Sequence, residues 1–546
     1  MKKLLFILSI LTITSQAQMS LDNSLEQLIE LQCGGSIDGT IDSSCASQIT
    51  HLELNRSYYV LSSLYVDWIN SIWPQLDTYL PNLDTVEITG NWSCYRGARE
   101  LNLNGSYVKN LIIESKFTDC FFGIKLNNNV SNFSFECDNL YGCLQINIEN
   151  LLNNSPDSLM ELSLSSLPFP VNFNTCSSNS LISLSLLNLE EYSSSYSFGF
   201  VDLNQFPNLK KLKIEEWQHS SYPNLSGIYN IDNLTHLSVN ASSLYFLDPS
   251  NASNLIDLEI KNSILTSIYL SNCNSLENLS LDNVDLTTIY LNGVNTLKNL
   301  NINNTNLSSL DLSTNLNLHS FDCVYNSQIS SLDITAQKKL EVLNCRYNSS
   351  LQTIDLYGAD SLNYLDCSNN NQLSSLDLTK QSKLEILICN NNSSLQTINF
   401  DGADSLNYLN CSNNNQLSSL DLTKQSKLEI LSCDSNLSLQ TINLDGADSL
   451  NQLNCSFNQL DTLDVSNNTN LKSLNCSNNQ LTKLDVSNNL ALTNLDCSNN
   501  QITDLDLQHN TNLISLYAGY NQLQYVNLKN GNNINMGSGL ELFIDI

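Results

Sequence analysis

The chain has 546 residues, and its 54 acidic and 23 basic residues give a net charge of -31 and an isoelectric point near 4.2. This charge disfavours nucleic acid and anionic membrane surfaces as partners, and it favours cations or basic protein surfaces. Length alone would suggest three or four globular domains, but internal periodicity takes precedence over length as a guide to architecture.

The N-terminal stretch "MKKLLFILSILTITSQAQ" has the pattern of a secretory signal. Two lysines precede an apolar run that is too short to span a bilayer, and small residues follow it. We therefore predict a signal peptide over residues 1–17, cleaved after Ala17. No second long apolar run follows, so the sequence predicts a secreted or cell-surface protein without a membrane span.

Residues 18–48 are predicted to form an N-terminal cap. They include the helix-like "LDNSLEQLIELQ", which could cover the open edge of the first repeat. In an exported protein, the pairs Cys33 with Cys45 and Cys137 with Cys143 are candidates for local disulfides, although sequence does not fix the connectivity.

Repeats dominate the rest of the chain. Residues 234–533 contain fourteen consecutive units of 21 or 22 residues with the pattern LxxLxCxxNxLxxLDVxxNxx. Residues 49–233 keep the same strand signature in longer, irregular units, and residues 534–546 form a C-terminal cap or tail. Each unit offers two inward apolar edges, which are buried only when a neighbouring unit stacks on it.

These repeats resemble the bacterial leucine-rich repeats of secreted and surface proteins, in which the second half of each unit imitates the first. The resemblance implies a right-handed leucine-rich repeat solenoid that is rich in parallel strands and has little helix. It also implies a role in adhesion or in contact with a host or matrix.

A longer repeat, made of two consecutive units, is superimposed on the repeat of 21 or 22 residues. Residues 329–372 recur nearly verbatim at 373–416, and again, one residue shorter, at 417–459. Such copies indicate unit duplication, which a solenoid tolerates because each unit touches only its neighbours. An enzyme active site would gain nothing from this duplication.

One row of the repeat is cysteine. In flanking units the same place holds Val239, Ile260, Leu281 and Ile302, so we interpret it as a core position, where a free thiol acts as a small apolar side chain. Stacked strands lie about 4.7–4.9 Å apart, beyond the usual Cβ separation of a disulfide, and no clustered metal ligands accompany the row. The predicted core ladder is Cys323, Cys345, Cys367, Cys389, Cys411, Cys433, Cys455, Cys476 and Cys497.

A second row is asparagine. In the family that the repeats resemble, this side chain turns inward and bonds backbone groups that the turn would otherwise leave unpaired. The alternative is an exposed row that reads glycans. The predicted turn ladder is Asn326, Asn348, Asn370, Asn392, Asn414, Asn436, Asn458, Asn479, Asn500 and Asn521.

A third row is mostly aspartate. Stacked like charges repel unless they are solvated or bridged, so the row indicates either solvated surface or a weak calcium site, and no known calcium loop motif is present. The row is Asp311, Asp333, Asp355, Asp377, Asn399, Asp421, Asn443, Asp464, Asp485 and Asp506.

The fourth row is an apolar stripe on the outward side of the first strand of each unit. Such a stripe indicates a contact surface, or else side chains that stabilise the sheet by packing across strands. The predicted ligand-binding residues are Val342, Tyr364, Ile386, Tyr408 and Ile430 with their polar neighbours Asp366 and Asn410.

The rows together favour a non-catalytic recognition module that binds a protein or surface polymer through its open sheet face. The alternative is a structural spacer or stalk with no dedicated binding face. The sequence shows no constellation of acid, base or nucleophile, no phosphate-binding loop and no metal-ligand cluster. We therefore predict that the protein is not an enzyme and has no cofactor and no metal.

Overall fold

A computed structural model of the chain describes residues 2–7, 49–56, 83–93, 99–102, 108–118, 122–125, 130–137, 159–165, 178–187, 201–215 and 227–531. The proposed cap at 18–48, the tail at 534–546 and the disulfide candidates Cys33, Cys45 and Cys143 lie outside these residues, and so does the side chain of Cys137. The chain forms two compact units, Met1–Leu265 and Thr266–Ile546.

The first unit is built on a sheet of parallel strands, each paired with the next one along the chain. Its strands are β1 (Lys2–Ile7), β2 (Ile49–Arg56), β3 (Thr85–Ser93), β5 (Asn110–Thr118), β7 (Asn132–Cys137), β8 (Glu161–Ser165), β9 (Ser183–Leu187), β11 (Lys211–Glu215), β13 (His236–Asn240) and β14 (Asp257–Ser263). Strand β1 lies within the predicted signal peptide, so cleavage after Ala17 would remove it from β2.

Two further strand pairs and one short helix complete the described part of this unit. The pairs are β4 (Arg99–Asn102) with β6 (Phe122–Lys125) and β10 (Val201–Asp202) with β12 (Ile228–Tyr229). The 3-10 turn η4 (Leu203–Gln205) begins at Asp202, whose carboxylate accepts a hydrogen bond from the Asn204 N–H. It is the one helical element among the described residues.

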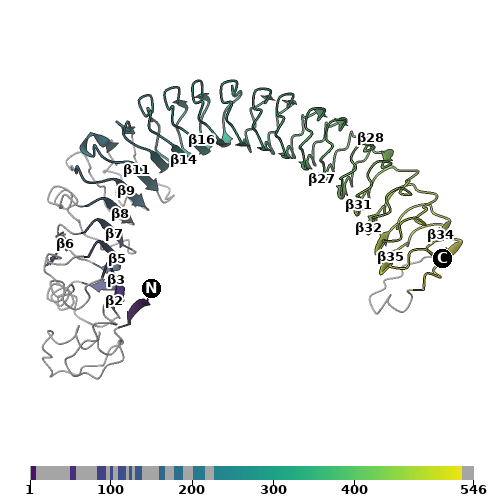
Figure 1. The fold of residues 1–546 in the computed structure, drawn as a ribbon, viewed down its shortest axis with the longest axis horizontal. Helices are drawn as coiled ribbons and strands as arrows, with labels where there is room; N and C mark the ends of the chain where they lie inside the picture. The colour runs from purple at the N-terminus through teal and green to yellow at the C-terminus, as the bar shows by residue number, and fades with distance from the viewer. Residues whose placement is uncertain are drawn as a thin grey trace. The chain divides into compact units, whose positions relative to one another are not determined.

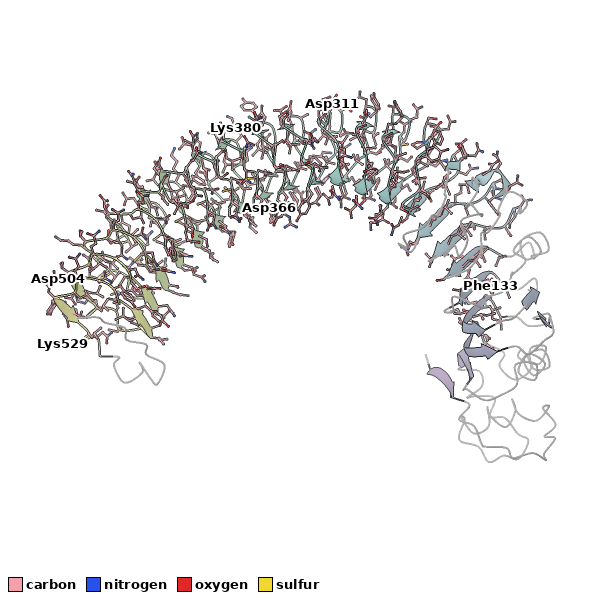
Figure 2. The ribbon with its side chains drawn as sticks, turned by 180° about the vertical axis from the view of Figure 1, so that it is seen from behind. Phe133, Asp311, Asp366, Lys380, Asp504 and Lys529 are labelled. Carbon is pink, nitrogen blue, oxygen red and sulfur yellow. The ribbon has the colours of Figure 1, made fainter. Side chains whose placement is uncertain are left out.

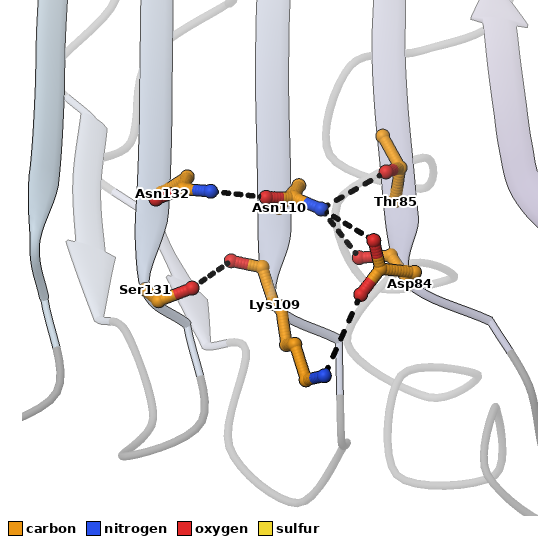
Figure 3. A network of polar contacts seen from close by, with 6 residues as sticks. All are labelled: Asp84, Thr85, Lys109, Asn110, Ser131 and Asn132. Atoms are coloured by element: carbon orange, nitrogen blue, oxygen red, sulfur yellow. Dashed lines mark hydrogen bonds and ion pairs between the residues drawn. The ribbon is translucent and has the colours of Figure 1, made fainter.

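Asparagines at the strand starts link neighbouring coils of this unit (Figure 3). The Asn132 amide donates to Asn110 Oδ1, and Asn110 Nδ2 donates to Asp84 Oδ2 at 2.8 Å and to Thr85 Oγ1 at 3.2 Å. The same register brings Lys109 Nζ within 3.9 Å of Asp84 Oδ1. These bonds hold β3, β5 and β7 in register where the strands begin.

The second unit repeats one coil many times, with one short strand on the front of each coil and, in most coils, a second strand on the back (Figure 1). The first strands pair in parallel in chain order. They are β16 (Asn278–Val284), β18 (Asn299–Thr305), β19 (Ser320–Asp322), β21 (Val342–Asn344), β23 (Tyr364–Asp366), β25 (Ile386–Ile388), β27 (Tyr408–Asn410), β29 (Ile430–Ser432), β31 (Gln452–Asn454), β32 (Ser473–Asn475), β33 (Asn494–Asp496) and β35 (Ser515–Tyr517). The solvent side of this sheet is called the front face below.

The second strands, on the back of most coils, pair two by two. The pairs are β15 (Ser267–Tyr269) with β17 (Thr288–Tyr290), β20 (Ser331–Asp333) with β22 (Thr353–Asp355), β24 (Ser375–Asp377) with β26 (Thr397–Asn399), β28 (Ser419–Asp421) with β30 (Thr441–Asn443), and β34 (Asp504–Asp506) with β36 (Tyr525–Asn527). Three of the five pairs, β20 with β22, β24 with β26 and β28 with β30, occupy equivalent positions in the three copies of the long sequence repeat.

That period divides most of the second unit into two regions. In the two-coil region, residues 329–449, the back corner of the coil alternates between glutamine and alanine, as in Gln381 and Ala403. In the one-coil region, residues 450–531, an asparagine such as Asn489 fills the corner of each coil. All of these corner side chains are buried.

The core lies between the two strands of each coil and consists mainly of leucine. Leu343, Leu365, Leu387 and Leu409 are fully buried on successive front strands, as the alternation of the sequence predicts. The predicted leucine-rich repeat solenoid, with parallel strands and little helix, is thus the fold that the described residues adopt.

Candidate functional site

The predicted apolar stripe occupies the first position of five adjacent front strands, β21, β23, β25, β27 and β29. The parallel register pairs Val342 with Tyr364, Tyr364 with Ile386, Ile386 with Tyr408, and Tyr408 with Ile430. All five side chains are half-buried. They therefore form one continuous row that is open to solvent on the front face.

The stripe ends abruptly on both sides. The equivalent position is Ser320 in β19 before it and Gln452 in β31 after it. Burial, followed by the nearby Asp366 carboxylate, raises the pKa of the Tyr364 hydroxyl, so this side chain stays neutral at physiological pH. The stripe is thus an uncharged strip within a strongly acidic protein.

Asp366 differs from the exposed polar neighbour that the sequence suggested. It is 3 % exposed, and its Oδ1 accepts hydrogen bonds from Ser368 N at 3.0 Å and Ser368 Oγ at 2.6 Å. Arg346 Nη1 lies 3.7 Å from Asp366 Oδ2. The side chain lies on the front side of its coil, opposite Asp311 and Lys380 (Figure 2), but its carboxylate holds the turn after β23.

Asn410 has the same relation to its own turn but remains half-buried. Its Oδ1 accepts a hydrogen bond from Ser412 N at 3.2 Å. Its Nδ2 has no hydrogen-bond partner among the described residues, so the amide N–H groups stay available at the front face. Of the two polar candidates, only Asn410 can therefore contribute to a contact surface.

The structure places all nine ladder cysteines in the core at 0 % exposure, each as a free thiol. Burial raises the pKa of Cys411 to about 12, so the thiol is protonated and unreactive at neutral pH. The described residues contain no group of three or more His, Cys, Asp or Glu side chains that could hold a metal ion. The ladder therefore acts as packing material.

The asparagine ladder lies inside the turn that follows each front strand. Asn370 Nδ2 donates to Cys367 O at 2.8 Å and to Cys345 O at 3.0 Å in the preceding coil, while Asn392 Oδ1 accepts from Asn370 N at 2.6 Å. Each amide thus bonds backbone groups of its own coil and of the preceding coil. The side chains face the interior, which leaves no exposed asparagine row here to read a ligand.

The residue before each of these asparagines has a left-handed backbone, a feature that the sequence pattern did not reveal. Half of the ten coils place asparagine there, as at Asn369 with a φ of 59° and Asn413 with a φ of 58°. Tyr325, Tyr347 and Phe457 occupy it with φ values of 60°, 61° and 55°. An aromatic side chain in this conformation is strained, because its Cβ crowds the following carbonyl oxygen.

The aspartate row has a structural function that its sequence pattern did not reveal. Each member caps its own turn by accepting a hydrogen bond from the backbone N–H two residues later, as Asp377 does from Thr379 at 3.0 Å and Asp485 from Ser487 at 2.9 Å. Asn399 and Asn443 do the same with Asp401 at 3.1 Å and Asp445 at 3.2 Å. A neutral amide oxygen serves equally well, which explains why asparagine replaces aspartate in this row.

A polar groove of about 320 Å³ borders the stripe where the front strands begin. It is lined by Glu341, Ser361, Asn363, Lys383, Glu385 and Ser405. The groove is visible only in the structure, because it combines side chains of consecutive coils, each taken from the residues directly before a front strand.

Residues 469–509 match the family model of leucine-rich repeats in two copies. A search of curated protein sequences found no match. Solved structures with a similar fold include the functional domain of InlJ from Listeria monocytogenes, which includes a cysteine ladder. That match has 26% identity over 54% of this chain and 69% of that one, with a TM-score of 0.37.

Two further solved structures have a similar fold. YopM from Yersinia enterocolitica is 18% identical over 77% of this chain and 85% of its own, with a TM-score of 0.38. The internalin InlF from Listeria monocytogenes is 19% identical over 54% of this chain and 81% of its own, with a TM-score of 0.33. The family match covers residues 469–509, and the described residues have the fold of a leucine-rich repeat solenoid.

Among the described residues, no helix is long and apolar enough to cross a membrane.

Proposed function

We propose that this chain is a non-catalytic recognition module, exported to the cell surface or beyond, that binds a protein or a surface polymer through the front face of its coils. One observation carries the proposal: five half-buried apolar side chains stand in register on adjacent strands, within a protein of net charge -31. An uncharged strip on an acidic surface favours contact with a partner.

A structural spacer remains the competing function, because β-branched and aromatic side chains also stabilise a sheet by packing across strands. A spacer, however, has no need to confine such residues to five strands and to flank them with Ser320 and Gln452. The restriction of the stripe to one segment therefore favours recognition.

The proposal is tested with a Tyr364→Ser/Tyr408→Ser double variant in a pull-down from host and bacterial surface extracts. Loss of these aromatic contacts should weaken binding of a captured partner by more than about 1 kcal/mol. Tyr357→Ser is the matched control, because Tyr357 is 69 % exposed in the turn that follows β22 on the back of the coil.

If both variants bind a validated partner as the wild type does, the stripe is sheet packing and the spacer function is the better one. Circular dichroism melts of the variants must accompany the assay, since Tyr364 and Tyr408 are half-buried. A common melting temperature would assign any loss of binding to the surface itself.

A further inference from the structure

The residue types that line the groove beside the stripe repeat along the sequence with a period of two coils. The lining combines two parallel rows of side chains, both from the residues directly before each front strand. The first row reads Lys339, Ser361, Lys383, Ser405, Lys427 and Ser449. The second row reads Glu341, Asn363, Glu385, Asn407, Glu429 and Asn451.

The rows follow the sheet from coil to coil. Glu341 O accepts hydrogen bonds from Asn363 N at 2.9 Å and from Tyr364 N at 3.1 Å, and Asn363 O accepts one from Glu385 N at 2.9 Å. Consecutive parallel strands lie about 4.8 Å apart, so equivalent groups two coils apart are separated by roughly 9.6 Å. The front strands thus present the same chemistry at regular intervals.

Most of the groove side chains are not used by the protein itself, although Lys427 Nζ donates to Ser405 Oγ at 3.4 Å. Glu341, Asn363, Lys383 and Glu385 have no side-chain hydrogen bond or ion pair among the described residues. By contrast, Lys339 Nζ donates to Asn317 Oδ1 at 2.6 Å at the edge of the two-coil region. Carboxylates, amides and an ammonium group are therefore free to accept from and donate to a ligand.

The aromatic residues share this period. Tyr364 and Tyr408 directly follow Asn363 and Asn407, so each two-coil repeat combines one aromatic ring, one amide, one carboxylate and one ammonium group. A folded protein partner has an irregular surface and cannot use identical contacts at a fixed interval. A linear polymer with a regular chemical repeat can, and its weak single contacts sum to avidity.

We propose that the groove binds a linear β-1,4-linked polysaccharide of acetamido sugars, with one disaccharide for every two coils; this assignment rests on the recognition function proposed above. Alternate rings of such a chain are flipped, so its chemical repeat is a disaccharide whose length is close to the two-coil spacing. Tyr364 and Tyr408 offer apolar ring faces to the sugar rings.

The polar groups of the groove match the same ligand. Asn363 and Lys383 donate to an acetamido carbonyl, and Glu385 accepts from sugar hydroxyl groups. The net charge of -31 repels acidic polysaccharides, which leaves uncharged acetamido polymers as the matching class.

The first test is calorimetric titration of the full chain with di-, tetra- and hexasaccharides of β-1,4-linked N-acetylglucosamine. Affinity should increase with each added disaccharide. The Asn363→Ala/Asn407→Ala variant should bind the hexasaccharide about tenfold more weakly, because each variant site loses one hydrogen-bonding amide. The control is Gln352→Ala/Gln440→Ala, which removes two exposed amides before the back strands and should bind as the wild type does.

A second variant lacks residues 373–416, one full copy of the long repeat. The deletion joins matching sequence to matching sequence, so the remaining coils keep their register and the melting transition checks that they fold. With one site fewer, lengthening the ligand from tetra- to hexasaccharide should increase affinity less in this variant than in the wild type.

Absence of binding to these oligosaccharides overturns the polysaccharide assignment, as does an affinity that is independent of length. If a protein partner is captured through Tyr364 and Tyr408 while oligosaccharides do not bind, the groove assignment fails and the recognition function stands. If the Tyr364→Ser/Tyr408→Ser variant also retains every captured partner, both fail.

Discussion

The two-coil and one-coil regions reach the same coil geometry through different interiors. In the one-coil region Asn489 Nδ2 donates to Val465 O at 2.9 Å and to Asn468 O at 2.9 Å, both in the preceding coil. In the two-coil region Gln381 Nε2 makes one such bond, to Leu356 O at 2.7 Å, and the coils between the glutamines have Ala359 or Ala403 at the corner. A long side chain in one coil is thus matched by a short one in the next.

The turn ladder differs between the regions in a parallel way. Asn392 Oδ1 accepts from Asn370 N, the equivalent residue of the preceding coil, at 2.6 Å. In the shorter coils Asn500 Oδ1 accepts instead from Leu481 N at 3.1 Å. One residue more or less in a turn therefore changes which backbone group the amide serves. The coil therefore tolerates both 21 and 22 residues, because the asparagine oxygen can accept a hydrogen bond from either backbone N–H group.

The largest expected effect comes from Gly446→Ala, which would disrupt the packing between coils in the two-coil region. A Cβ at this position would lie 1.8 Å from Thr423 O and 2.4 Å from its carbonyl carbon in the preceding coil. We expect a loss of about 3 kcal/mol or more of unfolding free energy, because the backbone must move. Urea denaturation followed by circular dichroism measures it.

Asn488→Ala is the matched change in the one-coil region, since Asn488 precedes its corner asparagine as Gly446 precedes Ala447. Asn488 is exposed, so the cost should stay within about 0.5 kcal/mol. Equal losses in the two variants would show that the glycine is not required by close contact between coils.

A pair of corner variants sharpens the comparison. Asn489→Ala removes two buried hydrogen bonds and should cost about 2 kcal/mol, whereas Gln425→Ala removes one bond, to Phe400 O at 2.9 Å, and should cost about 1 kcal/mol. Chemical denaturation measures the loss of unfolding free energy in each variant. The ratio of the two losses tests whether stability follows the number of hydrogen bonds that are removed. A costlier Gln425 variant would mean that the volume of the side chain matters more than its bonds.

Phe457→Asn should raise stability by about 1 kcal/mol near the junction of the two regions. Phe457 has a φ of 55° and is 54 % exposed, whereas asparagine occupies the same conformation one coil later, at Asn478. The reciprocal change Asn478→Phe should lower the melting temperature. If both variants shift it in the same direction, backbone conformation does not decide the effect.

The smallest expected effect is a difference in acid sensitivity. A hydrogen bond from the Ser487 backbone lowers the pKa of Asp485 below its ordinary value of 3.8. When the pKa of a carboxyl is lower in the folded state than in the unfolded state, the group stabilises the fold at pH values above its unfolded-state pKa. This stabilisation is lost as the pH falls through the folded-state pKa. Asp485→Asn should therefore change little at pH 7 and should flatten the stability profile below about pH 4.

The effect should amount to tenths of a kcal/mol, since this carboxylate is exposed and screened by solvent. Asn443, its counterpart in the two-coil region, is already neutral and should add nothing to the acid dependence. A fully acid-insensitive wild type would contradict the capping role of the aspartates.

The sequence predicted the start of each coil, the buried leucines and the parallel strands, because one periodic signal specifies all of them. It did not predict the two-by-two pairing of the back strands or the relation between Gln381 and Ala359. That relation depends on a contact between residues of neighbouring coils, and a pattern read within one unit carries no information about it.

The candidate site shows the same limit. The alternation of side chains placed Tyr364 and Tyr408 on the front face, where the structure has them half-buried. The same alternation placed Asp366 there as an exposed group, yet Ser368, two residues later, binds its carboxylate. The groove also escaped prediction, because its lining comes from the residues directly before the front strands of consecutive coils.

The buried cysteine ladder has a consequence for biogenesis if the chain is exported as proposed. An unfolded chain that enters an oxidising compartment exposes nine thiols at nearly equal intervals, and closing a loop between any two neighbours costs a similar entropy. Many wrong crosslinks would then form at comparable rates. Each thiol becomes inaccessible once the next coil stacks on it, so the order in which coils assemble also sets the time during which each sulfur is open to oxidation.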